Sequence, residues 1–519
     1  MSDWTVNAAG RRVPGVINDV AQVPFQGVGG FRPSGRKAAP AIASCNDYPA
    51  SGDKRVPSLR EALERAGLRD GMTIGSHHHF RNGDLVMNQV FAIAAEMGVK
   101  DLVWFPSAAF PCHAPVIEHM RNGVVRRVEG SLNGPLGLNA SHGKMAGAAV
   151  LRSHGGRWQA VQDGEVHIDI AILAAPTADA FGNATGDRGP SACGSLNFGL
   201  VDSLYADRVI VVTDNLVPFP CLPWQIQGNN VDFVVELERV GDPSQIVSGT
   251  TVLTRSPDRQ LIAELTAAFI RSTPYYRDGF SMQAGAGGTA LATAIYLREM
   301  MKADGFRAAF MRGGSTKYLV EMLEEGLIGT ILDGQTFDLD GVRSMRENAL
   351  HVATSPFTSY NWHGKGNFAS MIDFVVLGAT EVDRHFNANV VTHSDGLMLH
   401  GIGGWQNCLT AKVTILPIPS FRDRIPVLVD EVTTLCGPGE LIDVVVTERG
   451  IAVNPRREDL IGPARKAGLP LRPIEEIQAE VEALCGGKPA RPELGDEVVG
   501  AVKWVDGTLL DVIYRVPER

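Results

Sequence analysis

The sequence predicts an α/β protein made of two homologous halves, each with a mostly parallel sheet flanked by helices, and an N-terminal extended arm. Three observations predict this fold. Predicted strands and helices alternate along the chain, the same order of elements returns roughly 200 residues later, and residues 1–55 are rich in glycine and proline with little periodicity.

Composition narrows the class of protein. The chain has 519 residues, of which 44% are hydrophobic and 20% charged, which is typical of a globular enzyme with two or three domains. We expect neither a membrane span nor a secretory signal, because no apolar run is long enough and Met1–Val20 lack the signal pattern. Seven scattered cysteines without CxxC spacing indicate reduced thiols and a cytoplasmic protein. The net charge of −10 argues against general nucleic-acid binding.

The first α/β unit is predicted to begin directly after the arm. Ser58 and Glu61 have the spacing of a helix N-terminal capping box, and apolar residues at helical spacing follow them. A strand is predicted over 72–76, then a helix that ends at Gly98, and then a strand over 101–106. This order is typical of a parallel sheet.

The second half repeats the first at a nearly constant offset. The clearest pairs, 204 residues apart, are His167–Leu173 with Met371–Leu377, Asp179 with Asp383, and Asn183 with Asn387. A chance resemblance would not keep one register across several elements. We therefore divide the chain into an arm over 1–55 and two homologous domains over 56–250 and 251–519.

The repeat also predicts where a ligand binds. Ligands of open parallel sheets lie beyond the carboxyl ends of the strands. The loops that follow equivalent strands are therefore expected to meet at an interface between the two halves.

The first candidate site is the polar loop between the strand at 72–76 and the next helix. The residues that we assign to substrate binding are His77, His78, His79, Arg81, Asn82 and Gly83. Backbone amides at a helix N-terminus favour an anion, and an arginine can bind a carboxylate through two hydrogen bonds. We interpret the loop as a polyanion site to which protonated histidines contribute. The alternative for each histidine taken alone is packing within the sheet.

A metal site is a competing interpretation, because histidine is a common zinc ligand. Successive residues of a strand point to opposite faces, so three adjacent histidines are poorly placed to chelate one ion. The sequence also lacks HExxH and a cysteine cluster. We therefore expect no metal.

Glycine-rich segments form the second candidate site. The residues that we assign to binding a thioester are Gly285, Gly287 and Gly288, in the loop equivalent to the histidine loop, and Gly401, Gly403 and Gly404. Glycine lets a ligand approach the backbone closely, and backbone amides can hold a phosphate or an oxyanion. Gly287, Gly288, Gly403 and Gly404 are the candidate oxyanion donors, and no side chain is assigned a catalytic role. Tight turns are the alternative explanation.

Four further segments are less specific. Arg312–Ser315, after a strand predicted over 308–311, and His154–Arg157 are interpreted as two more glycine loops. Cys193 has no base near it in sequence, so we expect a turn residue rather than a nucleophile. Asn454–Arg457 is interpreted as a basic surface segment.

Several of these segments resemble the citrate lyase alpha subunit family. The most specific run is His77-His78-His79-Phe80-Arg81-Asn82-Gly83-Asp84, and the other matching segments are Arg152–Arg157, Val211–Pro218, Ile451–Arg457 and Gly35–Pro40. The resemblance covers nearly the whole chain. It implies the fold of the CoA-transferases, with two similar α/β domains, which agrees with the internal repeat.

The resemblance implies a transferase, a citrate CoA-transferase that exchanges the acetyl group on an acyl carrier for citrate and releases acetate. It implies an oligomeric complex with a β (lyase) subunit and a γ (acyl carrier) subunit. No cofactor is implied for the chain itself, because the carrier supplies a CoA-like prosthetic group and free acetyl-CoA can replace it. Citrate and acetyl-CoA are thus the expected small-molecule substrates.

Many CoA-transferases carry a glutamate nucleophile in a Ser-Glu-Asn-Gly motif, which is absent here. We therefore expect the two substrates to react directly in a ternary complex, through a mixed anhydride. Three alternatives stay open: a CoA-transferase or CoA-ester hydrolase for another carboxylate, a non-catalytic scaffold that docks an acyl carrier protein, and a metal-dependent hydrolase.

Overall fold

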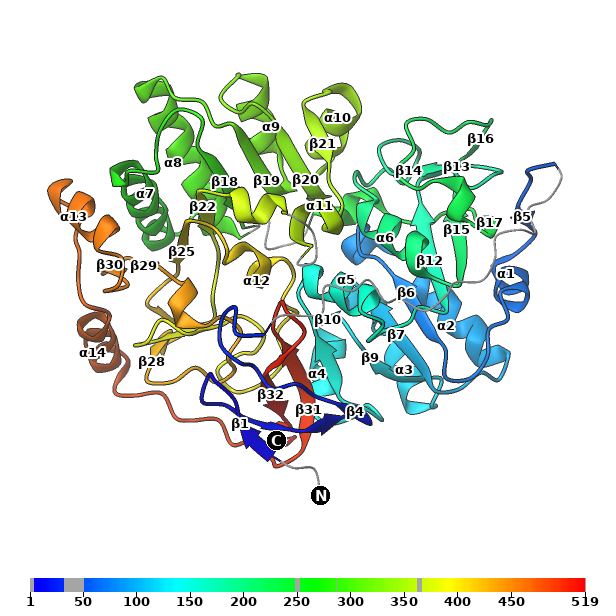
Figure 1. The fold of residues 1–519 in the computed structure, drawn as a ribbon, viewed down its shortest axis with the longest axis horizontal. Coiled ribbons are helices and arrows are strands. Elements are labelled where there is room, and N and C mark those ends of the chain that lie inside the picture. Colours follow the sequence, from blue (N-terminus) through cyan, green and yellow to red (C-terminus); the bar gives the residue numbers. More distant parts are fainter. Residues whose placement is uncertain (1–3, 32–50, 248–252, 286, 362–365, 519) are drawn as a thin grey trace.

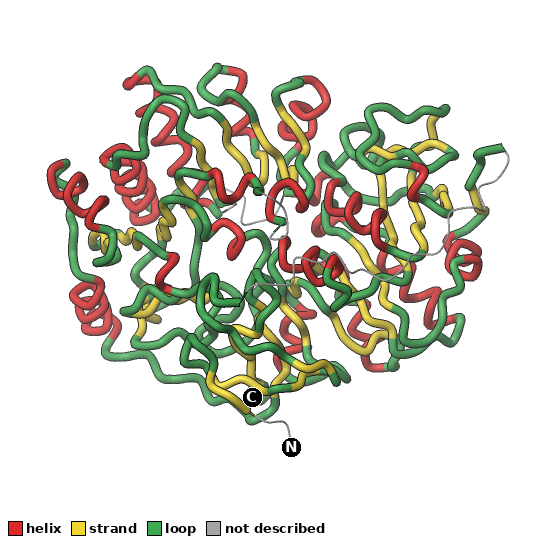
Figure 2. Tube along the Cα trace, viewed as in Figure 1, coloured by secondary structure: helices red, strands yellow, loops and turns green. Residues whose placement is uncertain are grey.

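The computed structural model describes residues 4–31, 51–247, 253–285, 287–361 and 366–518. The matching segment Gly35–Pro40 lies outside the described residues. The chain forms two large sheets, one in each half, and a smaller unit made from both ends of the chain (Figures 1 and 2).

Seven strands form the sheet of the first half, in the order β5-β17-β15-β12-β6-β7-β9, and all neighbours run parallel. The strands are β5 (Arg55–Val56), β6 (Thr73–Ser76), β7 (Leu102–Pro106), β9 (Val125–Val128), β12 (Ile170–Ala175), β15 (Arg208–Thr213) and β17 (Phe233–Glu236). The helices are α1 (Leu59–Arg65), α2 (Met87–Glu96), α3 (Val116–Arg121), α4 (Pro135–Ser141), α5 (His154–Gln162) and α6 (Asn197–Tyr205). The predicted strand, helix and strand after residue 71 are thus confirmed.

The sheet of the second half has the order β21-β20-β19-β18-β22-β25-β29-β30, and β30 alone runs antiparallel to its neighbour. The strands are β18 (Ser281–Ala284), β19 (Phe310–Ser315), β20 (Ile331–Thr336), β21 (His351–Ala353), β22 (Phe374–Val376), β25 (Val413–Pro417), β29 (Val444–Thr447) and β30 (Gly450–Val453). The helices are α7 (Pro257–Ser272), α8 (Gly288–Asp304), α9 (Lys317–Glu324), α10 (Leu339–Glu347), α11 (Pro356–Tyr360), α12 (Trp405–Cys408), α13 (Glu458–Lys466) and α14 (Ile474–Cys485).

The two sheets share one topology. The order β9-β7-β6-β12-β15-β17 in the first half corresponds to β20-β19-β18-β22-β25-β29 in the second. The repeat extends to single hydrogen bonds, because the amide of Asn183 donates to Asp179 at 2.8 Å and that of Asn387 donates to Asp383 at 3.0 Å. The predicted homologous α/β halves are confirmed, whereas the domain boundaries drawn at residues 55 and 250 stay a prediction.

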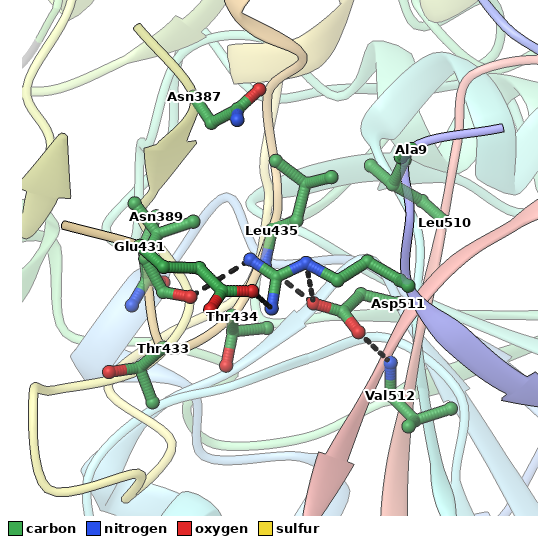
Figure 3. Close-up of polar contacts among 12 residues, drawn as sticks. Ala9, Asn387, Asn389, Glu431, Thr433, Thr434, Leu435, Leu510, Asp511 and Val512 are labelled. Atoms are coloured by element: carbon green, nitrogen blue, oxygen red, sulfur yellow. Dashed lines mark hydrogen bonds and ion pairs between the residues drawn. The ribbon is translucent and has the colours of Figure 1, made fainter. Parts of the chain in front are cut away.

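The smaller unit joins both ends of the chain to the body. β31 (Val498–Lys503) and β32 (Leu509–Tyr514) are antiparallel, and β31 also pairs with β11 (Ala149–Leu151) of the first half. The arm lies on this sheet through short strands, β1 (Trp4–Val6), β2 (Arg12–Pro14), β3 (Val16–Ile17) and β4 (Val20–Ala21). Arg11 lies 3.5 Å from Glu431 and 3.5 Å from Asp511, two acidic residues that Figure 3 labels. The described part of the arm therefore lies on the body of the same chain.

Two predicted glycine loops were wrong. Arg312–Ser315 belongs to β19, which continues beyond the predicted end at residue 311, and a register shift between Gly313 and Gly314 accommodates it. His154–Arg157 is the first turn of α5, whose N-cap Ser153 accepts a hydrogen bond from the Gly156 amide at 3.0 Å.

None of the helices in the described ranges combines the length and the apolar composition that crossing a bilayer requires.

Candidate functional site

The histidine loop leaves the carboxyl end of β6 and alternates its side chains between two directions. The rings of His77 and His79 stack at a centroid distance of 3.8 Å. His78 points elsewhere, with Nδ1 2.5 Å from the Ser107 hydroxyl and Nε2 3.0 Å from Oε1 of Gln335. Because Gln335 lies on β20, His78 connects the two halves. The loop after β6 therefore reaches the other half, whereas its meeting with the loop after the equivalent strand β18 stays a prediction.

Burial keeps these histidines neutral. Desolvation lowers the pKa of His79 to about 4 and holds the pKa values of His77 and His78 well below 6.5. His154, whose ring stacks on that of His78 at 5.2 Å, has its pKa lowered to about 3 by burial. The expectation of protonated histidines at the anion site is therefore wrong, because the folded structure desolvates them. A neutral imidazole can still donate one hydrogen bond.

Arg81 is the cation of this loop. Its guanidinium carbon lies 5.3 Å from the ring centroid of Phe110 and 4.6 Å from that of Phe337, which follows β20 in the second half. Burial lowers the pKa of Arg81 to about 10, so the side chain stays charged at neutral pH. The Nε atom has no hydrogen-bond partner among the described residues, and φ is +55°. A left-handed backbone at a buried non-glycine residue is typical of functional sites.

The next three residues of the loop fix its shape. The Asn82 side-chain oxygen accepts a hydrogen bond from the Cys112 amide at 2.9 Å. A Cβ on Gly83 would lie 2.3 Å from the Asp242 carbonyl oxygen, so this position has no room for a side chain. Asp84 accepts from the Val86 amide at 2.7 Å and from the Met87 amide at 3.2 Å, and so fixes the chain where it enters α2.

The first glycine segment lies at the carboxyl end of β18, the position equivalent to the histidine loop. Gly285 donates to the Val376 carbonyl at 2.8 Å, and α8 begins at Gly288 with Gly287 as its N-cap. Gly287 has no side chain that could bond the first-turn amides, which leaves them able to bind an anion. Ala286 lies outside the described residues.

The second glycine segment contacts the first half. A Cβ on Gly401 would lie 1.9 Å from the Ser131 hydroxyl, and one on Gly404 would lie 2.7 Å from the Tyr360 hydroxyl. The Gly403 carbonyl accepts from the His154 amide at 2.7 Å. Close packing accounts for glycine at positions 401 and 404, and a φ of +61° accounts for glycine at position 403. Oxyanion binding by Gly287, Gly288, Gly403 and Gly404 stays a prediction.

The structure adds residues that we did not assign to the site from the sequence. The His154 ring lies 5.2 Å from that of His78 and 6.4 Å from that of Tyr360, measured between ring centroids. Gln335 forms a hydrogen bond with His78. Helices α5, α6, α11 and α12 gather here between the two sheets (Figure 1). The only local signal was the His-Gly-Gly-Arg segment at His154, because Gln335 and Tyr360 come from stretches of ordinary composition.

Cys193 and Arg457 lie outside this site. The Cys193 thiol is fully buried, and burial raises its pKa well above 9, so it does not ionise as a nucleophile. Arg457 binds Asp443 at 2.7 Å and Asp459 at 2.8 Å. These observations agree with the structural roles predicted for both segments.

Within the described ranges, one group of side chains has the spacing of metal ligands. The ligand atoms of His167, Asp169 and Asp207 lie within 4.8 Å of one another. They lie at the amino ends of β12 and β15, whereas the histidine loop leaves the carboxyl end of β6. His77–His79 are not such a group, because His78 points away from the stacked rings of His77 and His79.

A family model described as the citrate lyase alpha subunit (CitF) matches residues 52–516. The chain belongs to the citrate lyase alpha subunit family. It is 41% identical over 467 residues to the citrate lyase alpha chain of Escherichia coli (strain K12), covering 90% of this chain and 91% of that one. It is 43% identical over 465 residues to the alpha chain of Klebsiella pneumoniae, covering 89% and 91%.

Solved structures agree with this family. An alpha subunit of citrate lyase from Streptococcus mutans, in complex with citrate, superposes with a TM-score of 0.90 at 41% identity, over 99% of this chain and 100% of that one. A malonate decarboxylase alpha subunit from Acinetobacter baumannii has a TM-score of 0.60 at 16% identity, over 84% and 94%, which shows the fold alone. The predicted CoA-transferase-like fold and the predicted citrate lyase alpha subunit are both confirmed, and the chain is an enzyme subunit.

Proposed function

We propose that this chain is the citrate CoA-transferase of a citrate lyase complex. It transfers a thioester from acetate to citrate, with acetyl-CoA or an acetylated carrier as donor. The observation that carries the proposal is a charged, buried Arg81 at the interface between the halves, in a chain of the citrate lyase alpha subunit family.

The transfer proceeds in two steps without a covalent enzyme intermediate. A citrate carboxylate oxygen attacks the acetyl carbonyl carbon, the C–S bond breaks, and a thiolate leaves a mixed anhydride behind. The thiolate then attacks the citryl carbonyl carbon, and acetate leaves with the electron pair of the broken C–O bond. Neither attack needs a strong base, since carboxylate and thiolate are already anionic.

The chain's own residues bind and orient the two anions. Arg81 binds a citrate carboxylate. His78 holds the loop beside it, because both of its ring nitrogens are already hydrogen-bonded, to Ser107 and to Gln335. The first-turn amides of α8 receive the oxyanion that develops in each step, and one such donor contributes about 3 kcal/mol. His77 and His79 help to fix the loop, because their rings stack on each other at 3.8 Å.

The chain needs partners to complete citrate cleavage. We infer two partner subunits, because the family model describes one subunit, the alpha subunit, of a larger enzyme. The β (lyase) subunit cleaves the citryl thioester, and the γ (acyl carrier) subunit carries the CoA-like group. We infer a cytoplasmic location from the cysteines, since those in the described ranges are free thiols.

The experiment incubates the purified chain with acetyl-CoA and citrate and measures citryl-CoA and acetate by mass spectrometry. Arg81→Ala is expected to lower kcat/KM for citrate roughly 10- to 100-fold, as for loss of hydrogen bonds to a charged group. The control is Arg121→Ala on the exposed face of α3, where Arg121 pairs with Glu118. Equal activity of the two variants would contradict the role of Arg81.

Acceptor profiling separates the competing functions. Higher turnover with malonate or another acid than with citrate would indicate a different CoA-transferase, and release of free CoA without an acceptor would indicate a hydrolase. A chain that binds the acyl carrier but transfers nothing would be a scaffold.

A further inference from the structure

Arg312 is a buried cation without an anionic partner in the described structure. It lies on β19, and its side chain is fully buried. Nη1 donates to Oε1 of Gln283 at 2.6 Å, and Cζ lies 4.6 Å from the ring centroid of Tyr360. Nε and Nη2 have no hydrogen-bond partner among the described residues. Both charge and hydrogen-bonding capacity are thus left uncompensated.

Arg157 shows how the same protein compensates another buried guanidinium. Its Nη1 donates to a carboxylate oxygen of Asp202 at 3.0 Å, and its Nη2 donates to the Phe105 carbonyl at 2.7 Å. Asp202 is fully buried as well, so the two charges cancel. Where Arg157 has the Asp202 carboxylate, Arg312 has the side-chain amide of Gln283 and the ring of Tyr360.

The free donors of Arg312 lie on one edge of the guanidinium. Nε–H and Nη2–H point in the same direction, and together they match the two oxygens of a carboxylate. Nη1, on the other edge, is the atom that Gln283 already holds. The remaining edge therefore has the chemistry of a carboxylate receptor.

Arg312 is close to the site described above. Tyr360, the last residue of α11, stacks against Arg312 on one side, and its ring centroid lies 6.4 Å from that of His154. The His154 ring in turn stacks on that of His78 at 5.2 Å. Arg312 is thus separated from the interface between the halves by one aromatic side chain.

We propose that Arg312 is a second carboxylate-binding position of this site, in addition to Arg81. It binds a substrate carboxylate through Nε and Nη2, and the ligand is either a carboxylate of citrate or the acetate that the reaction releases. This inference rests on the proposed function. A carboxylate bound there is enclosed away from water, where the ion pair is strong.

The test measures the melting temperature of the full chain with and without saturating citrate, and separately with acetate. Arg312→Met removes an unpaired buried charge, so the melting temperature without ligand is expected to stay unchanged or rise. The rise that a ligand causes in the wild type is expected to be lost. Loss for citrate identifies citrate as the occupant, and loss for acetate alone identifies acetate.

The matched variant is Arg157→Met, which leaves the Asp202 carboxylate buried and unpaired and is expected to lower the melting temperature. If Arg312→Met does not fold, Arg312→Lys is measured instead. Lysine keeps the charge but lacks the paired Nε and Nη2 donors, so the ligand-induced rise in melting temperature is expected to fall by half or more. An undiminished rise for both ligands in the folded Arg312 variant overturns the proposal. So does a wild-type chain whose melting temperature neither ligand raises.

Transfer by the wild type is measured in parallel. A wild type that forms no citryl-CoA would defeat the proposed function, whereas a ligand-induced rise that depends on Arg312 would still establish a carboxylate site.

Discussion

At the scale of single residues, four buried histidines make the stability of the fold depend on pH. The pKa of His79 is lowered to about 4 and that of His154 to about 3, while His77 and His78 also lie well below 6.5. Between these values and 6.5, the unfolded chain binds protons that the folded chain does not. The free energy of unfolding therefore falls as the pH falls below 6.5, because the unfolded chain takes up the protons first.

Urea unfolding at pH 7 and pH 5 checks this dependence. His154→Gln is expected to lose less stability between the two pH values than the wild type, because it removes one of the protonation sites. The control is His385→Gln in an exposed loop. A wild type equally stable at both pH values would contradict the neutral state of the buried rings.

Gly314 controls the position of a ring that contacts Arg81. A Cβ on Gly314 would lie 1.7 Å from the Phe337 ring, and that ring lies 4.6 Å from the guanidinium carbon of Arg81. Gly314→Ala is therefore expected to displace Phe337 and Arg81 and to lower kcat/KM for citrate roughly ten- to hundredfold. Steady-state kinetics measure the effect. The control is Gly462→Ala in α13, where an added Cβ meets nothing within 4 Å, and full activity of Gly314→Ala would show that Phe337 does not position Arg81.

At the scale of elements, α5 positions His154 through its N-cap. The Ser153 hydroxyl accepts from the Gly156 amide at 3.0 Å, and Ser58 caps α1 in the same way through the Glu61 amide at 3.1 Å. Ser153→Ala and Ser58→Ala are each expected to lower the free energy of unfolding by about 1 kcal/mol. Since α1 is remote from the site, only Ser153→Ala should also raise the KM for citrate. Unfolding curves and steady-state kinetics of both variants test this. Equal KM values for citrate in Ser153→Ala and Ser58→Ala would show that the N-cap of α5 does not position His154.

Local patterns predicted the elements well where propensity and tertiary packing agree. The N-cap at Ser58, the strand β6 and the helix α2 formed as expected, although only the Ser58 half of the predicted capping box is present among the described hydrogen bonds. Arg312–Ser315 became strand instead of loop because β19 pairs with β18 on one side and β20 on the other. Such pairing overrides the preference of glycine for turns, and it cannot be seen in a local window of sequence.

The candidate site was predictable only in part. The internal repeat located it between the halves, and the composition of the histidine loop identified Arg81. The neutral state of the histidines depends on burial, and the approach of Gln335 to His78 depends on docking of the two halves. Both are properties of the assembled fold, so spacing along the chain could not reveal them.

At the scale of the whole molecule, the ends of the chain bind the two halves together. β31 follows the second half in sequence and pairs with β11 of the first half, β32 pairs with β31, and the arm contacts β32. Arg11 completes this contact, because its Nη2 donates to the Val432 carbonyl at 2.9 Å while the guanidinium faces Glu431 and Asp511 (Figure 3).

Arg11→Ala is expected to release the arm. Asp511 is buried, and it would lose the nearest cation while still accepting hydrogen bonds from the Leu435 and Val512 amides. An unpaired buried carboxylate costs roughly 1–3 kcal/mol, so the free energy of unfolding should fall by that amount and a protease should cut within residues 4–31 faster. Arg12→Ala, which removes a guanidinium lying over the Trp4 ring, is the control. Adding Asp511→Asn to Arg11→Ala should recover part of the loss, because it removes the unpaired charge. If the double variant is less stable than Arg11→Ala alone, then the arm is held by packing and not by this ion pair.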